Sequence, residues 1–180
     1  MISIIGGKLT TAVSLAREAA RKLGLALAEP APIYIAPAPA NGVESTLRQW
    51  AHLAACRGNI PEASAQAVAE WHGGRALAIA HAARQNHCLA APLCPHSQHI
   101  VAEAVEAVRY ECAMTLGDIL LRRVPVALGA CWSETCSREA ANRIGSALSW
   151  NQSRIEKELE SFEEEREAFL RPKRASVGVA

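Results

Sequence analysis

The sequence has few aromatic residues, almost no net charge and no long apolar run, and each absence argues against a class of protein. Aromatic residues make up 4% of the 180 residues, too few for a surface on which nucleic-acid bases stack. Lysine and arginine (19) nearly balance aspartate and glutamate (18), so no overall basic field attracts nucleic acid or acidic lipid. No apolar run reaches the roughly 18 residues of a membrane-spanning helix, and the opening residues lack a secretory signal pattern. We therefore expect no nucleic-acid partner.

The composition instead predicts a folded, mainly α protein. Hydrophobic residues are 50% of the chain and charged residues 21%, which excludes wholesale disorder. The chain is long enough, and rich enough in helix formers, to need no disulfide framework. We expect its six cysteines to be reduced, as in the cytoplasm, with Cys112 packed as a small hydrophobe on a periodic apolar face.

The opening residues predict a strand, a glycine loop and a helix. Residues 2–5 are a β-branched apolar run, Gly6-Gly7 follows, and 8–11 lead into a segment with helical apolar spacing that Gly24 ends. A glycine turn at a helix N-terminus presents free N–H groups and a positive dipole end, which suit an anionic or electron-rich ligand group. An ordinary strand-to-helix turn is the alternative interpretation.

The predicted strand has no evident partner in this sequence. A lone buried strand leaves its backbone groups unpaired, at a cost of roughly 1–3 kcal/mol per buried group. We therefore expect the chain to be the C-terminal piece of something larger. Four prolines between Ala28 and Gly42 then predict a semi-extended linker.

From about Val43 onward, apolar periodicity and breaker residues predict helices only. We place the boundaries at 1–26 for the strand-loop-helix unit, 27–43 for the linker, 44–171 for a helical domain and 172–180 for a disordered tail. The expected helices cover about 44–57, 61 to the break at Gly73-Gly74, 75–85, 101–112, a short one ending at Arg122-Arg123, 134–148 and 152–170.

Two of these helices carry specific side-chain expectations. In the helix expected at 101–112, the apolar face is formed by valines and a cysteine, and the charged residues Glu103, Glu106 and Arg109 are placed away from it. In the last, seven glutamates between 156 and 167 are placed on a solvated face, opposite apolar residues at helical spacing. Those apolar positions are Ile155, Leu159, Phe162 and Phe169.

Near the short helix, Thr115-x-x-Asp118 resembles a capping box, and Asp118 and Arg122 have the i, i+4 spacing of an ion pair. Glu111 is a second expected partner for the arginine pair, Arg122-Arg123. Structural pairing is the favoured interpretation, and a docking patch for an acidic partner is the alternative.

The Cys/His-rich stretch 87–99 is the most metal-like feature of the sequence. Thiolates and imidazoles could form a tetrahedral zinc site, but the spacing contains no C-x-x-C pair, and we predict no bound metal. Isolated histidines, including His72, are interpreted as surface or packing residues, and no catalytic triad is predicted. The candidate ligands of this stretch are Cys88, Cys94, His96 and His99.

Three stretches together resemble one family. Residues 4–11, Ile-Ile-Gly-Gly-Lys-Leu-Thr-Thr, look like the G-G-K-L-T-T segment that closes the flavin domain of FAD-dependent glycerol-3-phosphate dehydrogenases and oxidases. Residues 71–76 resemble a helix break written Y-G-S-R-A in that family, and residues 103–123 resemble its E-M-A-x-T-L-x-D-x-L-x-R-R segment. The match runs in order from Ile2 to about Leu170.

The resemblance implies oxidation of sn-glycerol 3-phosphate to dihydroxyacetone phosphate, with electrons passing through FAD to a quinone or to oxygen. The opening strand-loop-helix unit would be left over from the flavin-binding domain, and the helical domain would pack on the catalytic part. If the roles of the family's residues apply at the matching positions of this sequence, Lys8 would place positive charge near the substrate or the reduced flavin. The implied flavin-site residues are Gly6, Gly7, Lys8, Leu9 and Thr10.

The sequence contains no G-x-G-x-x-G unit to hold the FAD pyrophosphate, so we expect no catalysis by this chain alone. The resemblance implies an N-terminal flavin domain, which either precedes these residues in a longer chain or, if the gene is split, is a partner polypeptide. It also implies a cytoplasmic enzyme that as a whole can associate with the inner face of the membrane. Two alternatives stay open. One is a stand-alone helical interaction module that uses Arg122-Arg123 or the opening strand, and the other is a zinc-binding regulator.

Overall fold

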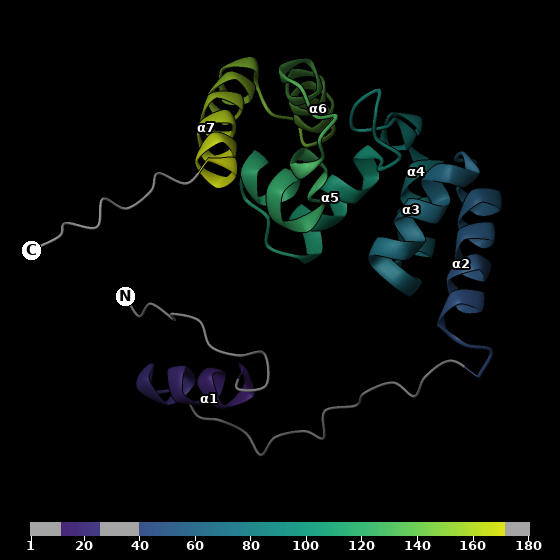
Figure 1. Cartoon of the computed structure of the whole chain (residues 1–180), viewed down its shortest axis with the longest axis horizontal. Coiled ribbons are helices and arrows are strands. Elements are labelled where there is room, and N and C mark those ends of the chain that lie inside the picture. Colours follow the sequence, from purple (N-terminus) through teal and green to yellow (C-terminus); the bar gives the residue numbers. More distant parts are fainter. Residues whose placement is uncertain (1–11, 26–39, 172–180) are drawn as a thin grey trace, which may run out of the picture. The chain divides into compact units, whose positions relative to one another are not determined.

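The computed structural model describes residues 12–25 and 40–171, and the chain divides into two compact units, Met1–Ala38 and Pro39–Ala180. In these described ranges the regular structure is helical, apart from an isolated β-bridge between Pro92 and Ile100 (Figure 1). The predicted mainly α fold class is therefore confirmed. The predicted strand at 2–5 lies outside the described residues, as do most of the linker and the tail 172–180, so the domain boundaries stay predictions.

Within the first unit, the structure describes one helix, α1 (Ala12–Lys22). Its last turn carries Arg21 and Lys22, whose positive charges favour the negative end of the helix dipole. Gly24 follows with φ +70°, a left-handed conformation that glycine adopts at little cost. The helix therefore ends where the basic residues and the glycine predict.

The second unit begins with three helices that pack closely through small side chains. These are α2 (Val43–Gly58), α3 (Glu62–His72) and α4 (Ala76–Gln85). A short 3₁₀ turn, Gly73–Arg75, connects the last two, so the predicted break at Gly73-Gly74 is confirmed. Alanine dominates the contact surface, which lets the helix backbones approach one another. Fully buried members of this group are Ala54, Ala65, Val68, Ala69, Ala76, Ala80 and Ala83.

The rest of the unit is built around α5 (Val101–Tyr110), which contacts both α4 and α6 (Glu134–Ala147). Between α4 and α5 the chain forms a 3₁₀ turn, His87–Ala90, and a loop. After α5 come a π-helical segment, Asp118–Arg123, and a 3₁₀ turn, Val126–Leu128. The terminal helix α7 (Gln152–Leu170) packs against α6, and Figure 1 shows this arrangement. Nearly every predicted helix of this unit is therefore present.

Three side-chain predictions are wrong. Cys112 is exposed and not packed, because α5 ends at Tyr110 and Cys112 adopts a left-handed conformation with φ +57°. Glu103 is fully buried and does not point to solvent, because α5 is covered on nearly all sides. Phe169 is 57% exposed, because the apolar contact of α7 is made by Ile155 and Phe162 earlier in the helix.

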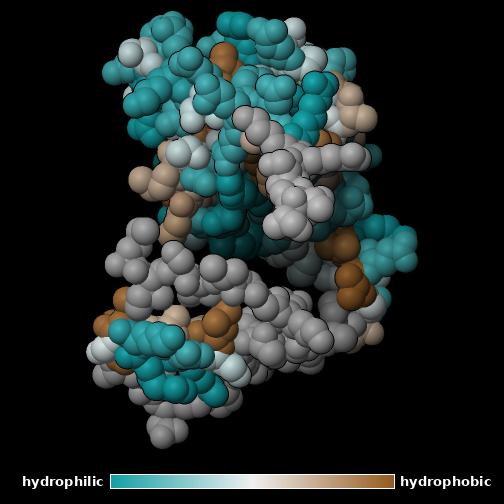
Figure 2. Space-filling model, turned by 60° about the vertical axis from the view of Figure 1, so that its left-hand side comes forward, coloured by the Kyte–Doolittle hydropathy of each residue, from teal (hydrophilic) through white to brown (hydrophobic). Residues whose placement is uncertain are grey.

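The face of the molecule shown in Figure 2 is largely hydrophilic in its described part, with hydrophobic residues scattered among polar ones. No helix in residues 12–25 and 40–171 combines the length and the apolar composition needed to cross a membrane.

Candidate functional site

The residues that the sequence assigns to the flavin site lie outside the described part of the chain. They are Gly6, Gly7, Lys8, Leu9 and Thr10. Their role stays a prediction, and the chemistry that the structure does describe lies elsewhere, around a buried carboxylate in the helical unit.

That carboxylate belongs to Glu103, in the first turn of α5. Its side chain is fully buried and receives three hydrogen bonds. Glu103 Oε1 lies 2.9 Å from His72 Nε2 and 2.8 Å from His99 Nδ1, and Oε2 accepts from the Ile100 N–H at 2.6 Å. The cluster therefore joins the end of α3, the loop before α5 and α5 itself. We call Glu103, His72 and His99 the buried carboxylate cluster.

Electrostatics favour the ionised form of this carboxylate. Burial alone would raise the pKa of Glu103, but hydrogen bonds from His72, His99 and the Ile100 amide outweigh it, and the pKa lies below its ordinary value. The carboxylate also caps a helix N-terminus, where the dipole favours negative charge. Since both oxygens are buried and bonded within the protein, the cluster is suited to holding three segments together rather than to exchanging protons with a substrate.

Aromatic side chains extend the cluster to the surface. The Trp71 ring meets the His99 ring edge-on, with centroids 6.3 Å apart, and its indole N–H donates to the Arg123 carbonyl at 2.6 Å. Trp71 is nevertheless 50% exposed. Trp71 thus connects the π-helical segment to the buried carboxylate cluster.

A second contact between an arginine and α5 lies nearby in sequence. Arg75 bonds the Glu106 carboxylate and lies 5.3 Å from the Tyr110 ring centroid.

A pocket of about 380 Å³ opens beside His99. His99 keeps 23% of its side chain exposed, and the pocket walls combine apolar and polar groups. In the described ranges, no three histidine, cysteine or acidic side chains gather closely enough to hold a metal ion. The lining residues are Ala67, Cys94, His96, Ser97, Gln98, His99, Pro125, Val126, Gly129, Cys131 and Trp132.

The predicted ion pairs of the short helix are present. Arg122 lies 3.7 Å from Asp118 and also bonds Glu165 of α7, and Arg123 lies 3.8 Å from the Glu111 carboxylate. The predicted capping box forms as well, since the Asp118 N–H donates to Thr115 Oγ1 at 3.0 Å. These arginines therefore pair within the unit, as the structural interpretation predicts.

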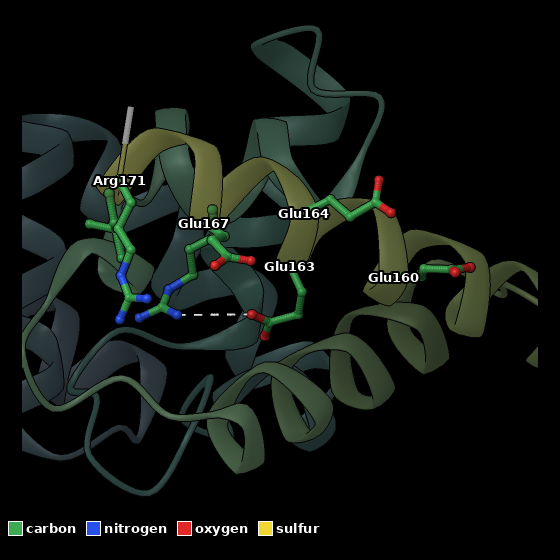
Figure 3. A pocket seen from close by; sticks show the side chains of 7 residues that line it. Glu160, Glu163, Glu164, Glu167 and Arg171 are labelled. Atoms are coloured by element: carbon green, nitrogen blue, oxygen red, sulfur yellow. Dashed lines mark ion pairs between the residues drawn. The ribbon is translucent and has the colours of Figure 1, made fainter. Parts of the chain in front are cut away.

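The glutamate-rich side of α7 lines an open pocket of about 460 Å³ (Figure 3). The dashed line in the figure joins Glu163 to Arg166 at 3.9 Å, an i, i+3 ion pair. Glu160 and Glu164 are exposed and point away from this pair. With Ile155 and Phe162 buried on the other side, the predicted amphipathic helix is confirmed.

Sequence reasoning missed the buried carboxylate cluster. The sequence pattern places His72 alone, as a surface or packing residue, and places Glu103 away from the apolar face of its helix. The available signal is the pair of alanines on either side of Glu103, Ala102 and Ala104, since small apolar neighbours let a helix pack closely on that side, and a buried acidic residue must find partners.

Comparison with known proteins gives one match. No curated protein and no solved structure shows a significant match to the chain. The model of the family described as the C-terminal domain of alpha-glycerophosphate oxidase matches residues 2–155. This range contains both the Gly6–Thr10 segment and the helices from α1 to α6. The chain therefore belongs to the family of C-terminal domains of alpha-glycerophosphate oxidase.

Proposed function

We propose that this chain is the C-terminal part of an FAD-dependent enzyme that oxidises sn-glycerol 3-phosphate to dihydroxyacetone phosphate. The observation that carries the proposal is the family match over residues 2–155. That family belongs to FAD-dependent oxidases, and the Gly-Gly-Lys-Leu-Thr-Thr segment at 6–11 resembles the one beside the flavin.

In this proposal the cofactor is held mainly by a flavin-binding domain, which either precedes these residues in a longer chain or is a partner polypeptide. The chain itself carries no G-x-G-x-x-G unit for the pyrophosphate. FAD, when bound, supplies the acceptor for the hydride of the substrate. The residues of this chain that would line its edge are Gly6, Gly7, Lys8, Leu9 and Thr10.

Lys8 and the N-terminal end of its helix would place positive charge where a reduced, anionic flavin forms. The helical unit would pack against the catalytic part without supplying reacting groups. The whole enzyme would work in the cytoplasm, with peripheral association at the inner face of the membrane.

The test is flavin retention. The chain is purified alone and after co-expression with an upstream polypeptide that carries G-x-G-x-x-G, and flavin absorbance and fluorescence are recorded. We expect flavin only in the co-purified complex, which should then oxidise glycerol 3-phosphate. Lack of flavin in both preparations, with a folded helical chain, would instead favour a stand-alone interaction module.

A matched pair of variants tests the role of Lys8. In the reconstituted enzyme, Lys8→Ala should lower turnover while the far-ultraviolet circular dichroism stays unchanged. Lys22→Ala, on the exposed end of α1, is the control and should leave turnover unaltered. Equal kinetics for Lys8→Ala and wild type would refute the assigned role.

A further inference from the structure

The pocket beside His99 lies between two segments that are each held by hydrogen bonds. In the loop before α5, the Leu93 N–H donates to the His99 carbonyl at 2.8 Å, and the His99 N–H donates to Ser97 Oγ at 3.0 Å. On the opposite wall, the backbone N–H of Trp132 donates to the Gly129 carbonyl at 3.1 Å. The volume of about 380 Å³ lies in the range of small-molecule sites. A ligand would therefore enter a pocket whose walls are already ordered.

His99 directs one ring nitrogen to the protein and leaves the other accessible. Nδ1 lies 2.8 Å from Oε1 of the fully buried Glu103. Because an ionised carboxylate can only accept, Nδ1 carries the proton, and Nε2 of the neutral ring is then an acceptor. Within residues 12–25 and 40–171, Nε2 has no hydrogen-bond partner, and the atom is not fully buried. Since the ring is 23% exposed and lines the pocket, this acceptor is open to a ligand there.

The other wall residues decide which kind of ligand fits. Pro125, Val126 and the Trp132 ring are apolar, and the indole N–H of Trp132 is already used, since it donates to Ser137 Oγ at 2.8 Å. None of the described residues that line the pocket is an aspartate, glutamate, lysine or arginine. A carboxylate or ammonium ligand would find no fixed opposite charge there. An apolar ring that carries one donor would find both an apolar surface and an acceptor.

We propose that this pocket binds a small uncharged phenol, whose hydroxyl donates to His99 Nε2 and whose ring packs against Trp132, Pro125 and Val126. A phenol combines the two properties that the walls require, because its ring has a large apolar area and its hydroxyl is a donor at one edge. In this arrangement Glu103 is a positioning residue, since it fixes the tautomer and the orientation of His99. The site uses the helical unit alone and does not depend on the flavin proposal.

The test is a titration of the purified, isotope-labelled full chain with phenol, followed by nuclear magnetic resonance of the imidazole nitrogens. At mildly alkaline pH an ordinary histidine is neutral and a phenolic hydroxyl keeps its proton. We expect a saturable shift of the His99 Nε2 resonance, and the backbone amides of Ala67 and Val126, on the pocket walls, should shift in step. Shifts that do not saturate, or that leave His99 unchanged, would overturn the proposal.

Two further probes test the chemistry of the contact. Anisole has the same ring but carries a methyl group in place of the hydroxyl hydrogen, so it should bind roughly 2- to 12-fold more weakly than phenol, the effect of one net hydrogen bond. Benzoate carries a negative charge and should bind no more tightly than anisole. Equal affinities for phenol and anisole would contradict the hydrogen bond to His99, and tighter binding of benzoate would show that the pocket selects anions.

A matched pair of variants tests the location. Val126 and Leu128 belong to the same 3₁₀ turn, and of the two only Val126 lines the pocket. Val126→Trp should fill the pocket and abolish the shift of His99, whereas Leu128→Trp, at a position that is 37% exposed, should keep it. A phenol shift that survives in Val126→Trp would place the ligand elsewhere and overturn the proposal. The titrations of the wild-type chain with the three probes require no variant, so the test stands even where Val126→Trp impairs folding.

Discussion

Replacing Glu103 by glutamine should destabilise the helical unit strongly while leaving the shape of the side chain almost unchanged. In the wild-type protein, one oxygen of this buried carboxylate accepts from His72 Nε2 and His99 Nδ1, and the other accepts from the Ile100 N–H. A glutamine has one acceptor and one donor in their place. With the amide oxygen kept toward the two imidazoles, the amide nitrogen faces the Ile100 N–H, so a donor faces a donor.

The size of the effect follows from these contacts. A buried donor left without an acceptor costs about 1–3 kcal/mol, and bonds to a charged group are at the upper end of the range. Turning the amide nitrogen toward Ile100 leaves one donor unsatisfied, so we expect the free energy of unfolding to fall by about 2–3 kcal/mol. For a chain of this length that corresponds to roughly 4–12 °C in the thermal midpoint. Glu103→Ala, which also leaves a cavity, should cost about 3–5 kcal/mol.

The pH dependence gives a second, independent signature. The pKa of Glu103 is lower in the folded protein than its ordinary value of about 4.3. The ionised group therefore stabilises the fold fully above that value, and this contribution is lost as the pH falls through the lower, folded pKa. The difference in stability between wild type and Glu103→Gln should be largest near neutral pH and should shrink as the pH falls below about 4.

The assay is urea denaturation followed by circular dichroism at several pH values, with Glu160→Gln as the control. Glu160 is exposed on α7, so its substitution should change stability by less than about 0.5 kcal/mol. The reasoning is refuted if Glu103→Gln unfolds at the urea concentration of wild type, or if its deficit stays the same across the pH range.

Other substitutions test packing and capping by the same denaturation assay. A Cβ at Gly58 would lie 2.9 Å from Ala80 Cβ and 3.0 Å from the Ala80 carbonyl, so Gly58→Ala should cost about 1–3 kcal/mol, and an added Ala80→Gly should recover part of it. No loss in Gly58→Ala would show that α2 and α4 are not in close contact there. Trp71→Phe removes the indole donor of the 2.6 Å bond to Arg123 and should cost about 0.5–1.5 kcal/mol, since the site is half exposed. Asp118→Ala removes the acceptor for the Met114 and Thr115 N–H groups and should cost about 1–2 kcal/mol, whereas stability equal to that of Glu160→Gln would argue against the capping role.

The sequence predicts where helices begin and end when a glycine, a proline or a capping side chain marks the place. The break at Gly73-Gly74, the Thr115–Asp118 capping box and the end of α1 near Gly24 all follow from local backbone preferences. The end of α5 carries no such mark. There the Ala113 N–H bonds the Ala107 carbonyl at 3.1 Å and bypasses Cys112, which takes a left-handed conformation that its type does not predict.

The buried carboxylate cluster could not be predicted in the same way, because periodicity assumes that a helix has one buried and one solvated side. α5 violates that assumption. Besides its valines it buries Ala102, Ala104 and Ala107, so its surroundings cover the side on which Glu103 lies as well. Once Glu103 is buried, its charge must be compensated, and His72 and His99 supply donors from two other segments. The burial of Glu103 is thus a consequence of the central position of α5, and its three hydrogen bonds join α5 to the end of α3 and to the loop at His99.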